Sequence, residues 1–182
     1  KALAYFEAAN VNNIAETASL IPSPLSNNTT GETNWLATPI IPEPHLLVIG
    51  GGIDARPLVN MAQQLGWKVS LWDPRPANAR KEYFSNVNHI IKGEAHVLTD
   101  FVAEKDVNAA ILMSHSVAID AQALKALAET KIKYLALLGP NNRKQQVISQ
   151  AEVDEQSLSF TFAGPAGIEI GGTLPESIAL SI

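Results

Sequence analysis

Three small residues and one acidic residue in the chain have the types and spacing needed to hold a nucleotide-like cofactor. Gly50, Gly52 and Ala55 fit the pattern G-x-G-x-x-G/A, and Asp73 follows about 20 residues later. In this pattern Gly50 permits a tight turn out of a strand, and Gly52 lets the backbone approach a pyrophosphate. Ala55 keeps the next helix close to the sheet, and Asp73 accepts hydrogen bonds from a ribose diol. The expected chemistry is therefore the binding of a phosphate-bearing cofactor.

The residues around these positions predict the elements that must hold them in place. Residues 46–49 form a short aliphatic run, typical of a buried strand. Residues 58–65 carry apolar side chains at helical intervals, and Gly66 is placed to end that helix. Residues 68–72 indicate a second strand, which ends directly before Asp73. The amide groups at the start of the helix would face an anion, which the helix dipole also attracts.

Strand and helix patterns continue to alternate from residue 45 to the end of the chain. We expect strands over residues 88–91, 109–113, 134–138 and 158–162, helices over 118–129 and 141–150, a short helix at 79–84 and a short strand at 96–98. This alternation predicts an α/β fold, a doubly wound and mostly parallel Rossmann-like sheet with helices on both faces and the strand order 3-2-1-4-5-6. Thr173 and Glu176 indicate a capping box for a final helix.

Residues 1–44 differ in composition from the 45–182 domain. We expect an amphipathic helix within residues 1–20, followed at 22–44 by a linker or surface loop rich in Pro, Asn, Thr and Ser. The first residue is Lys, and the last five residues look like a helix cut short. We therefore expect a fragment whose N-terminal domain is missing.

Further polar groups should gather at the same edge, because the carboxyl ends of parallel strands lie together. The candidate cofactor-binding residues are Gly50, Gly51, Gly52, Ala55, Asp73, Arg75, Ser114, His115, Gly139, Asn141, Arg143, Gly167 and Glu169. Glycines and basic side chains recur among them although the chain carries a net charge of −5, which suits an anionic ligand. His115 is the candidate for catalysis, but a lone histidine more often has a structural role, and this one could cap the next helix or satisfy a backbone carbonyl. Arg75 could be a solvated loop residue, and Asp120 could merely stabilise a helix dipole.

The composition argues against several classes of function. A net charge of −5 disfavours a nucleic-acid surface. No apolar run approaches the roughly 20 residues needed to span a bilayer, and no signal peptide is visible, so we expect a cytoplasmic protein. The chain contains no cysteine, which excludes disulfides, zinc–thiolate sites and a nucleophilic thiol of its own. Its histidines lack metal-ligand spacing, and we expect no metal site.

Several stretches together resemble the XdhC/CoxI family. The two most specific are DPRP at residues 73–76 and the closing pattern P-x-G-I-E-I-G…P-E-S-I-A-L-S-I. The glycine turn, the segment around His115 and the run LLGPNNRK add to the resemblance, which covers the family's C-terminal Rossmann domain over residues 45–182. Members of this family are accessory proteins that mature xanthine and carbon monoxide dehydrogenases.

The resemblance implies a non-catalytic chaperone that binds molybdenum cofactor, as molybdopterin or its dinucleotide, with a phosphate at residues 50–52. It also implies two partners: a cysteine desulfurase that supplies the terminal sulfur, and the apo-molybdoenzyme that receives the cofactor. Two other hypotheses stay open. One is an NAD(P)-dependent oxidoreductase with Asp73 on the ribose and His115 as acid or base. The other is a non-catalytic nucleotide-binding regulatory module. The oligomeric state is open too, a homodimer included.

Overall fold

The computed structural model describes residues 19–22, 34–37 and 42–182, and its contacts divide the chain into two units, 1–42 and 43–182. In the first unit β1 (Ser19–Pro22) pairs antiparallel with β2 (Asn34–Ala37). The region expected to be a linker thus contains a strand, which at four residues is too short to leave a clear alternating pattern. The helix expected within residues 1–20 lies outside the described residues, except for its last two positions, which belong to β1.

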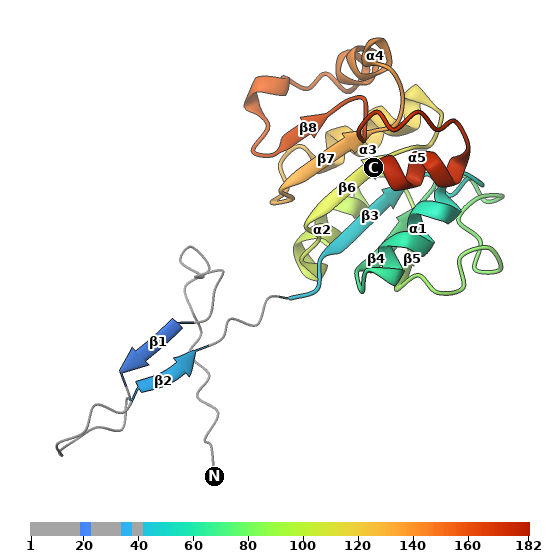
Figure 1. Cartoon of the computed structure of the whole chain (residues 1–182). Helices are drawn as coiled ribbons and strands as arrows, with labels where there is room; N and C mark the ends of the chain where they lie inside the picture. Colours follow the sequence, from blue (N-terminus) through green and yellow to red (C-terminus); the bar gives the residue numbers. More distant parts are fainter. Residues whose placement is uncertain (1–18, 23–33, 38–41) are drawn as a thin grey trace. The chain divides into compact units, whose positions relative to one another are not determined.

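Six parallel strands form the sheet of the second unit, in the order β5-β4-β3-β6-β7-β8 (Figure 1). Their bounds are β3 (His45–Ile49), β4 (Lys68–Trp72), β5 (His89–Ile91), β6 (Ala109–Leu112), β7 (Tyr134–Leu137) and β8 (Thr161–Ala163). Counted from β3, this is the predicted order 3-2-1-4-5-6. The doubly wound parallel fold expected from the sequence is confirmed.

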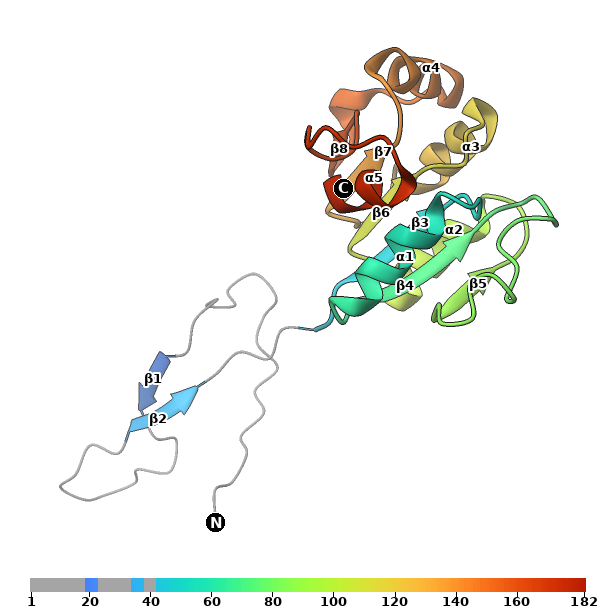
Figure 2. The same cartoon turned by 45° about the vertical axis from the view of Figure 1, so that its right-hand side comes forward.

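Helices cover both faces of this sheet. They are α1 (Ala55–Gln64), α2 (Val97–Lys105), α3 (Val117–Leu127), α4 (Asn141–Ala151) and α5 (Pro175–Ser181), with a 3₁₀ turn at Glu155–Ser157. Two views show α1 and α5 together on one face and α2, α3 and α4 on the other (Figures 1 and 2). In the described part of the chain, none of these helices has the length and apolar character that crossing a bilayer requires.

Alternate residues of the central strand enter two separate apolar cores. Leu47 and Ile49 pack in the cluster that contains Leu124 of α3, whereas Leu46 and Val48 pack in the cluster that contains α1 and α5 residues. All four side chains are buried, and each contributes about 2 kcal/mol through removal from water. This double burial makes the sheet a firm support for the loops at its carboxyl edge.

Two weakly marked elements were predicted wrongly. Residues 79–84 form turns instead of a helix, because Ala79 adopts a φ of 47°, in the left-handed region. Residues 96–98 begin α2 instead of forming a strand. The apolar residues Leu98 and Val102 are both buried at a spacing of four, which places them on one helical face against the sheet.

The capping box predicted for the last helix is also wrong. Leu174 occupies the N-cap position of α5 with an extended backbone, and its side chain makes no capping hydrogen bond. Pro175 is the first helical residue, and its fixed φ favours that starting point. Thr173 therefore lies one residue too early to act as the cap, while Glu176 does fall in the first turn.

Candidate functional site

The first two glycines of the turn after β3 let it contact neighbouring loops. A Cβ at Gly50 would lie 2.6 Å from the Cα of Ser114, and the φ of Gly50 is +112°. A Cβ at Gly51 would lie 2.3 Å from the backbone nitrogen of Ala79. Only glycine permits approaches this close, so both positions serve the packing of the β3, β4 and β6 loops.

The third glycine faces open space. No atom lies within 4 Å of a Cβ built at Gly52. The backbone amides of Gly52, Ile53 and Asp54 donate no hydrogen bond to any described residue, and α1 begins directly afterwards at Ala55, which is buried. Three open amide groups at the positive end of a helix dipole suit an anionic ligand group.

Asp73 is turned toward the protein and is saturated with hydrogen bonds. Its carboxylate accepts from the Gly51 amide at 2.8 Å, from Asn78 Nδ2 at 2.9 Å, from the Arg75 amide at 3.0 Å, and from Arg75 Nε and Nη2 at 2.8 and 2.7 Å. A carboxylate offers about four lone-pair positions, and five donors already occupy them. Contact with a ribose diol, as the sequence predicts, would require Arg75 to move away.

The electrostatics of Asp73 fit this internal role. Burial alone would raise the pKa of its carboxyl group, but the hydrogen bonds from Arg75, Gly51 and Asn78 outweigh burial and lower the pKa from 3.8 to about 2. The same pairing raises the pKa of the Arg75 guanidinium. Asp73 is therefore a charged group that fixes the β4 loop against the glycine turn.

A second buried carboxylate, Asp120 of α3, organises the next strand end. Its Oδ1 accepts from Ser114 Oγ at 2.6 Å, and its Oδ2 accepts from Arg143 Nη2 at 2.6 Å. A Cβ at Gly139 would lie 2.6 Å from Arg143 Cδ, so this glycine leaves room for the arginine stem. Asn141, by contrast, is exposed at the start of α4. Sequence reasoning missed Asp120, since a carboxylate in a first helical turn is explained by the dipole alone.

The two carboxylate clusters form one network. Arg75 Nη2, which binds Asp73, also donates to the backbone oxygen of Ser114 at 3.0 Å. Ser114 in turn binds Asp120, which holds Arg143. The loops after β4 and β6 and the first turns of α3 and α4 are thus joined by charge-assisted hydrogen bonds along the carboxyl edge.

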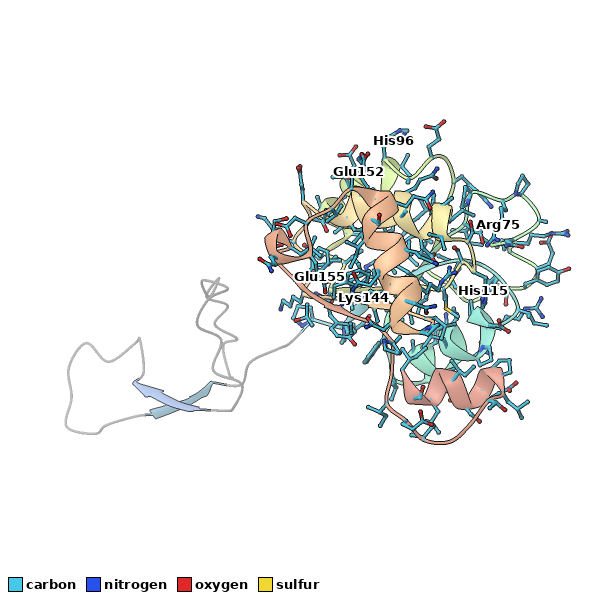
Figure 3. The ribbon with its side chains drawn as sticks, turned by 90° about the horizontal axis from the view of Figure 1, so that it is seen from above. Arg75, His96, His115, Lys144, Glu152 and Glu155 are labelled. Carbon is cyan, nitrogen blue, oxygen red and sulfur yellow. The ribbon has the colours of Figure 1, made fainter. Side chains whose placement is uncertain are left out.

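His115 lies at the outer side of this network. Its Nε2 is 2.9 Å from Asp54 Oδ2, and 60% of its side chain is exposed. Figure 3 shows His115 and Arg75 on the same side of the domain. His115 does not cap α3, because the cap is Ser116, whose Oγ accepts from the Ile119 amide. A backbone φ of 60° holds His115 in the left-handed region, a strained conformation that is frequent at functional sites.

The last two candidates, Gly167 and Glu169, lie in the closing segment before α5. A Cβ at Gly167 would meet Ser181 Oγ at 2.6 Å, so this glycine packs against the end of α5. Glu169 is exposed, and it makes no hydrogen bond within the described part of the chain. Nearby, Lys144 Nζ contacts Glu155 at 2.5 Å and the Phe162 backbone oxygen at 2.7 Å, which ties α4 to β8 (Figure 3).

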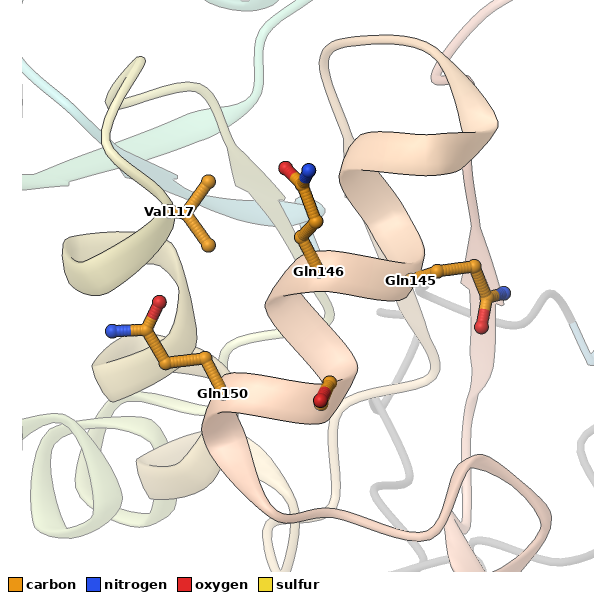
Figure 4. Close-up of a pocket in the computed structure, with 5 residues that line it drawn as sticks. Val117, Gln145, Gln146 and Gln150 are labelled. Carbon is orange, nitrogen blue, oxygen red and sulfur yellow. The ribbon is translucent and has the colours of Figure 1, made fainter.

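A separate hollow lies between α3 and α4. Its lining is neutral and rich in amides, formed by Val117, Gln145, Gln146, Ser149 and Gln150 (Figure 4). It lacks the basic groups that an anionic ligand requires. Across the residues that the structure describes, no three His, Asp or Glu side chains gather as a possible metal site.

The fold and this edge define a Rossmann-type domain whose glycine turn is open at Gly52. The sequence pattern of the family described as the XdhC Rossmann domain matches residues 46–182, and the chain belongs to this family. The resemblance noted in the sequence to XdhC proteins is confirmed.

Comparisons with individual proteins agree. The chain is 28% identical over 174 residues to a Bacillus subtilis (strain 168) protein described as a probable xanthine dehydrogenase subunit; the match covers 96% of this chain and 50% of that protein. It superimposes on the crystal structure of a xanthine dehydrogenase from Bacillus halodurans with a TM-score of 0.63 and 26% identity, covering 77% of this chain and 40% of that one. The chain thus spans half or less of these relatives.

A more distant likeness concerns the fold alone. UDP-glucose 4-epimerase from Brucella ovis, solved in complex with NAD, matches with a TM-score of 0.53 and 11% identity over 66% of this chain and 50% of that chain.

Proposed function

We propose that this domain is the cofactor-binding part of a maturation factor for a xanthine- or carbon-monoxide-dehydrogenase-type molybdoenzyme. It binds molybdenum cofactor in the cytoplasm, supports its sulfuration by a partner and delivers it to the apo-enzyme. Membership in the XdhC family supports this assignment. The single observation that carries the binding role is the open space above Gly52, surrounded by three amides that donate to none of the described residues.

The residues present fit such a cofactor in one specific respect. The phosphate of molybdopterin, or the pyrophosphate of its dinucleotide, matches amide donors at a helix start. Gly50, Gly51 and Asp73 maintain the conformation of the turn through contacts within the protein. These 182 residues contain no cysteine, so none of them can carry a persulfide, which supports a partner desulfurase as the sulfur source.

The test uses the open position directly. Gly52→Val adds a side chain into space that no protein atom occupies, so we expect normal folding and loss of the cofactor. The protein is purified from cells that make molybdenum cofactor, and bound pterin is measured by fluorescence after oxidation, with molybdenum by mass spectrometry. Asn60→Val, at an exposed position of α1, is the control. Wild-type protein without pterin, or Gly52→Val with a full complement, would contradict the proposal.

One observation favours a second candidate, an NAD(P)-dependent oxidoreductase. His115 and Asp54 form a paired imidazole and carboxylate beside the open turn, an arrangement suited to acid–base chemistry. Against it, the oxygens of Asp73 are occupied, so the residue expected to hold the ribose is engaged elsewhere. Calorimetric titration with NADH separates the two: we expect no saturable binding, and saturable binding would favour the oxidoreductase.

A further inference from the structure

Arg56, the second residue of α1, has an unexplained buried donor. Its Nε is buried and has no hydrogen-bond partner, and the side chain enters no ion pair within the described residues. Leaving a buried donor unpaired costs about 1–3 kcal/mol. A natural protein carries few such groups, and each calls for a reason such as an absent binding partner.

The guanidinium of Arg56 is held in place by an aromatic ring. Its Cζ lies 4.2 Å from the centroid of the Tyr83 ring, and the Cζ of Arg80 lies 5.4 Å from the same centroid. The N–H groups of a guanidinium lie in its plane, so stacking on a ring occupies the face and does not use these in-plane donors. Tyr83 is 48% exposed, which places this stack at the surface.

The turn between residues 79 and 84 creates this arrangement. Because Ala79 fits under Gly51, the segment carrying Arg80 and Tyr83 is fixed beside the glycine turn. A helix over residues 79–84, as predicted from the sequence, would not place Arg80 and Tyr83 in this way. Helical side chains lean toward the N-terminus of their helix, and for α1 that end is the turn containing Gly52.

The local charge is positive within an acidic chain. Arg80 contacts Glu82 at 3.3 Å, but both side chains are largely exposed, and such surface pairs contribute little. Lys92 adds a further cation by donating to the Ala79 backbone oxygen at 3.3 Å. Two guanidinium groups thus lie on the Tyr83 ring and one ammonium group binds the neighbouring Ala79 oxygen, while Glu82 pairs with Arg80 and Asp54 pairs with His115. This concentration of cations favours an anion.

We propose that Arg56, stacked on Tyr83 and flanked by Arg80, anchors a phosphate or pyrophosphate group of an organic ligand. The guanidinium fork binds two phosphate oxygens while the ring keeps it aligned. Naming this ligand as the cofactor rests on the proposed function, whereas the anion site rests on the contacts of Arg56 itself. The remainder of the ligand then extends along the glycine turn toward Gly52.

Calorimetry with inorganic pyrophosphate at low ionic strength tests the site. We expect saturable binding by the wild-type protein and a loss of about tenfold or more in Arg56→Met, since a charge-assisted hydrogen bond is removed. Tyr83→Leu should weaken binding by about threefold, because the ring contributes only alignment. Arg56→Lys should retain only part of the affinity, since a point charge replaces the planar fork. Lys125→Met, an exposed cation on α3, should bind as the wild type does.

The outcomes separate this inference from the proposed function. Absence of pyrophosphate binding by the wild type, or equal binding by Arg56→Met and Lys125→Met, overturns the anchor. Bound pterin is then measured in the same variants. Pterin that persists at the wild-type level in Arg56→Met refutes Arg56 as the anchor of the cofactor and leaves the proposed function standing. Arg56-dependent pyrophosphate binding by a protein that never carries pterin supports the anchor and refutes the cofactor assignment. Urea denaturation of each variant identifies any loss caused by unfolding.

Discussion

The amide of Gly51 donates a 2.8 Å hydrogen bond to the carboxylate of Asp73, so two parts of the expected ligand site bind each other. The residues of the glycine motif therefore fall into two groups with different roles. Gly50, Gly51 and Asp73 maintain the turn, while Gly52 and the amides after it face outward. Under the proposed function, backbone amides and nearby basic side chains would hold the ligand, while Asp73 maintains the turn that carries these amides.

The first prediction concerns Asp73 and stability. Asp73→Asn removes the charge that pairs with Arg75, and we expect a loss of about 2 kcal/mol in the free energy of unfolding at pH 7, since Arg75 is 40% exposed and water partly screens its charge. The folded-state pKa of about 2 lies below the ordinary 3.8, so the charged carboxylate of Asp73 contributes its full stabilisation of the folded state above pH 3.8. As the pH falls toward 2, about 2 kcal/mol of stability should be lost.

Urea denaturation at pH 7 and at pH 3 measures both effects. Glu104→Gln is the control, because Glu104 is exposed and contacts only its neighbour Lys105. If Asp73→Asn unfolds at the same urea concentration as Glu104→Gln, the carboxylate does not organise the loop.

The second prediction concerns the pair of Asp120 and Arg143. Asp120 is fully buried, so Arg143→Met leaves an uncompensated charge and should cost about 3–5 kcal/mol. Asp120→Asn in the same chain removes that charge, and the double variant should be more stable than the two single losses predict. A double-mutant cycle measured by urea denaturation gives the coupling, expected at about 2 kcal/mol. Strict additivity would show that the two side chains do not depend on each other.

The sequence predicted the sheet well because buried parallel strands are continuous apolar runs. Residues 46–49 and 134–137 are of this kind, and their flanking turns carry Gly and Pro. The short β5, at three residues, and α2 were less clear, since brief apolar segments fit a helix or a strand equally.

The sequence predicted where the network at the carboxyl edge lies, but not which side chains pair with each other. The candidates were expected at one edge, but Arg75 reaches Ser114 across 39 residues, and such a pairing leaves no periodic signal in one sequence. Asp54 occupies a position of the glycine motif that the fingerprint leaves unspecified, and Arg56 directly follows the last motif residue, Ala55. Their partners, His115 and Tyr83, come from two other loops, so only the fold brings them together.

The third prediction is a pH dependence set by His45. Burial lowers the pKa of His45 below its ordinary 6.5, although a hydrogen bond to the Lys105 backbone oxygen partly opposes this. The unfolded chain therefore takes up a proton first as the pH falls below 6.5, and stability decreases there by up to about 1.4 kcal/mol per pH unit. His45→Gln should flatten the dependence between pH 7.5 and 5.5, measured by urea denaturation. His96→Gln, largely exposed, should keep the wild-type slope; a slope unchanged by His45→Gln would contradict this assignment.

The fourth prediction concerns the start of α5, where Leu174 occupies the N-cap position. Leu174 is 66% exposed, so replacing it sacrifices little burial, and its extended backbone is already that of a cap residue. A serine there can accept a hydrogen bond from an amide of the first turn, and Leu174→Ser should raise the free energy of unfolding by up to about 1 kcal/mol. Leu180→Ser is the matched control, because Leu180 is 70% exposed within the same helix but cannot act as a cap. Helix α5 packs on α1, and the open amides lie at the N-terminus of α1. A single thermal transition in both variants would therefore indicate that the closing segment and the glycine turn unfold together. Equal stabilities for the two variants would show that α5 gains nothing from a capped start.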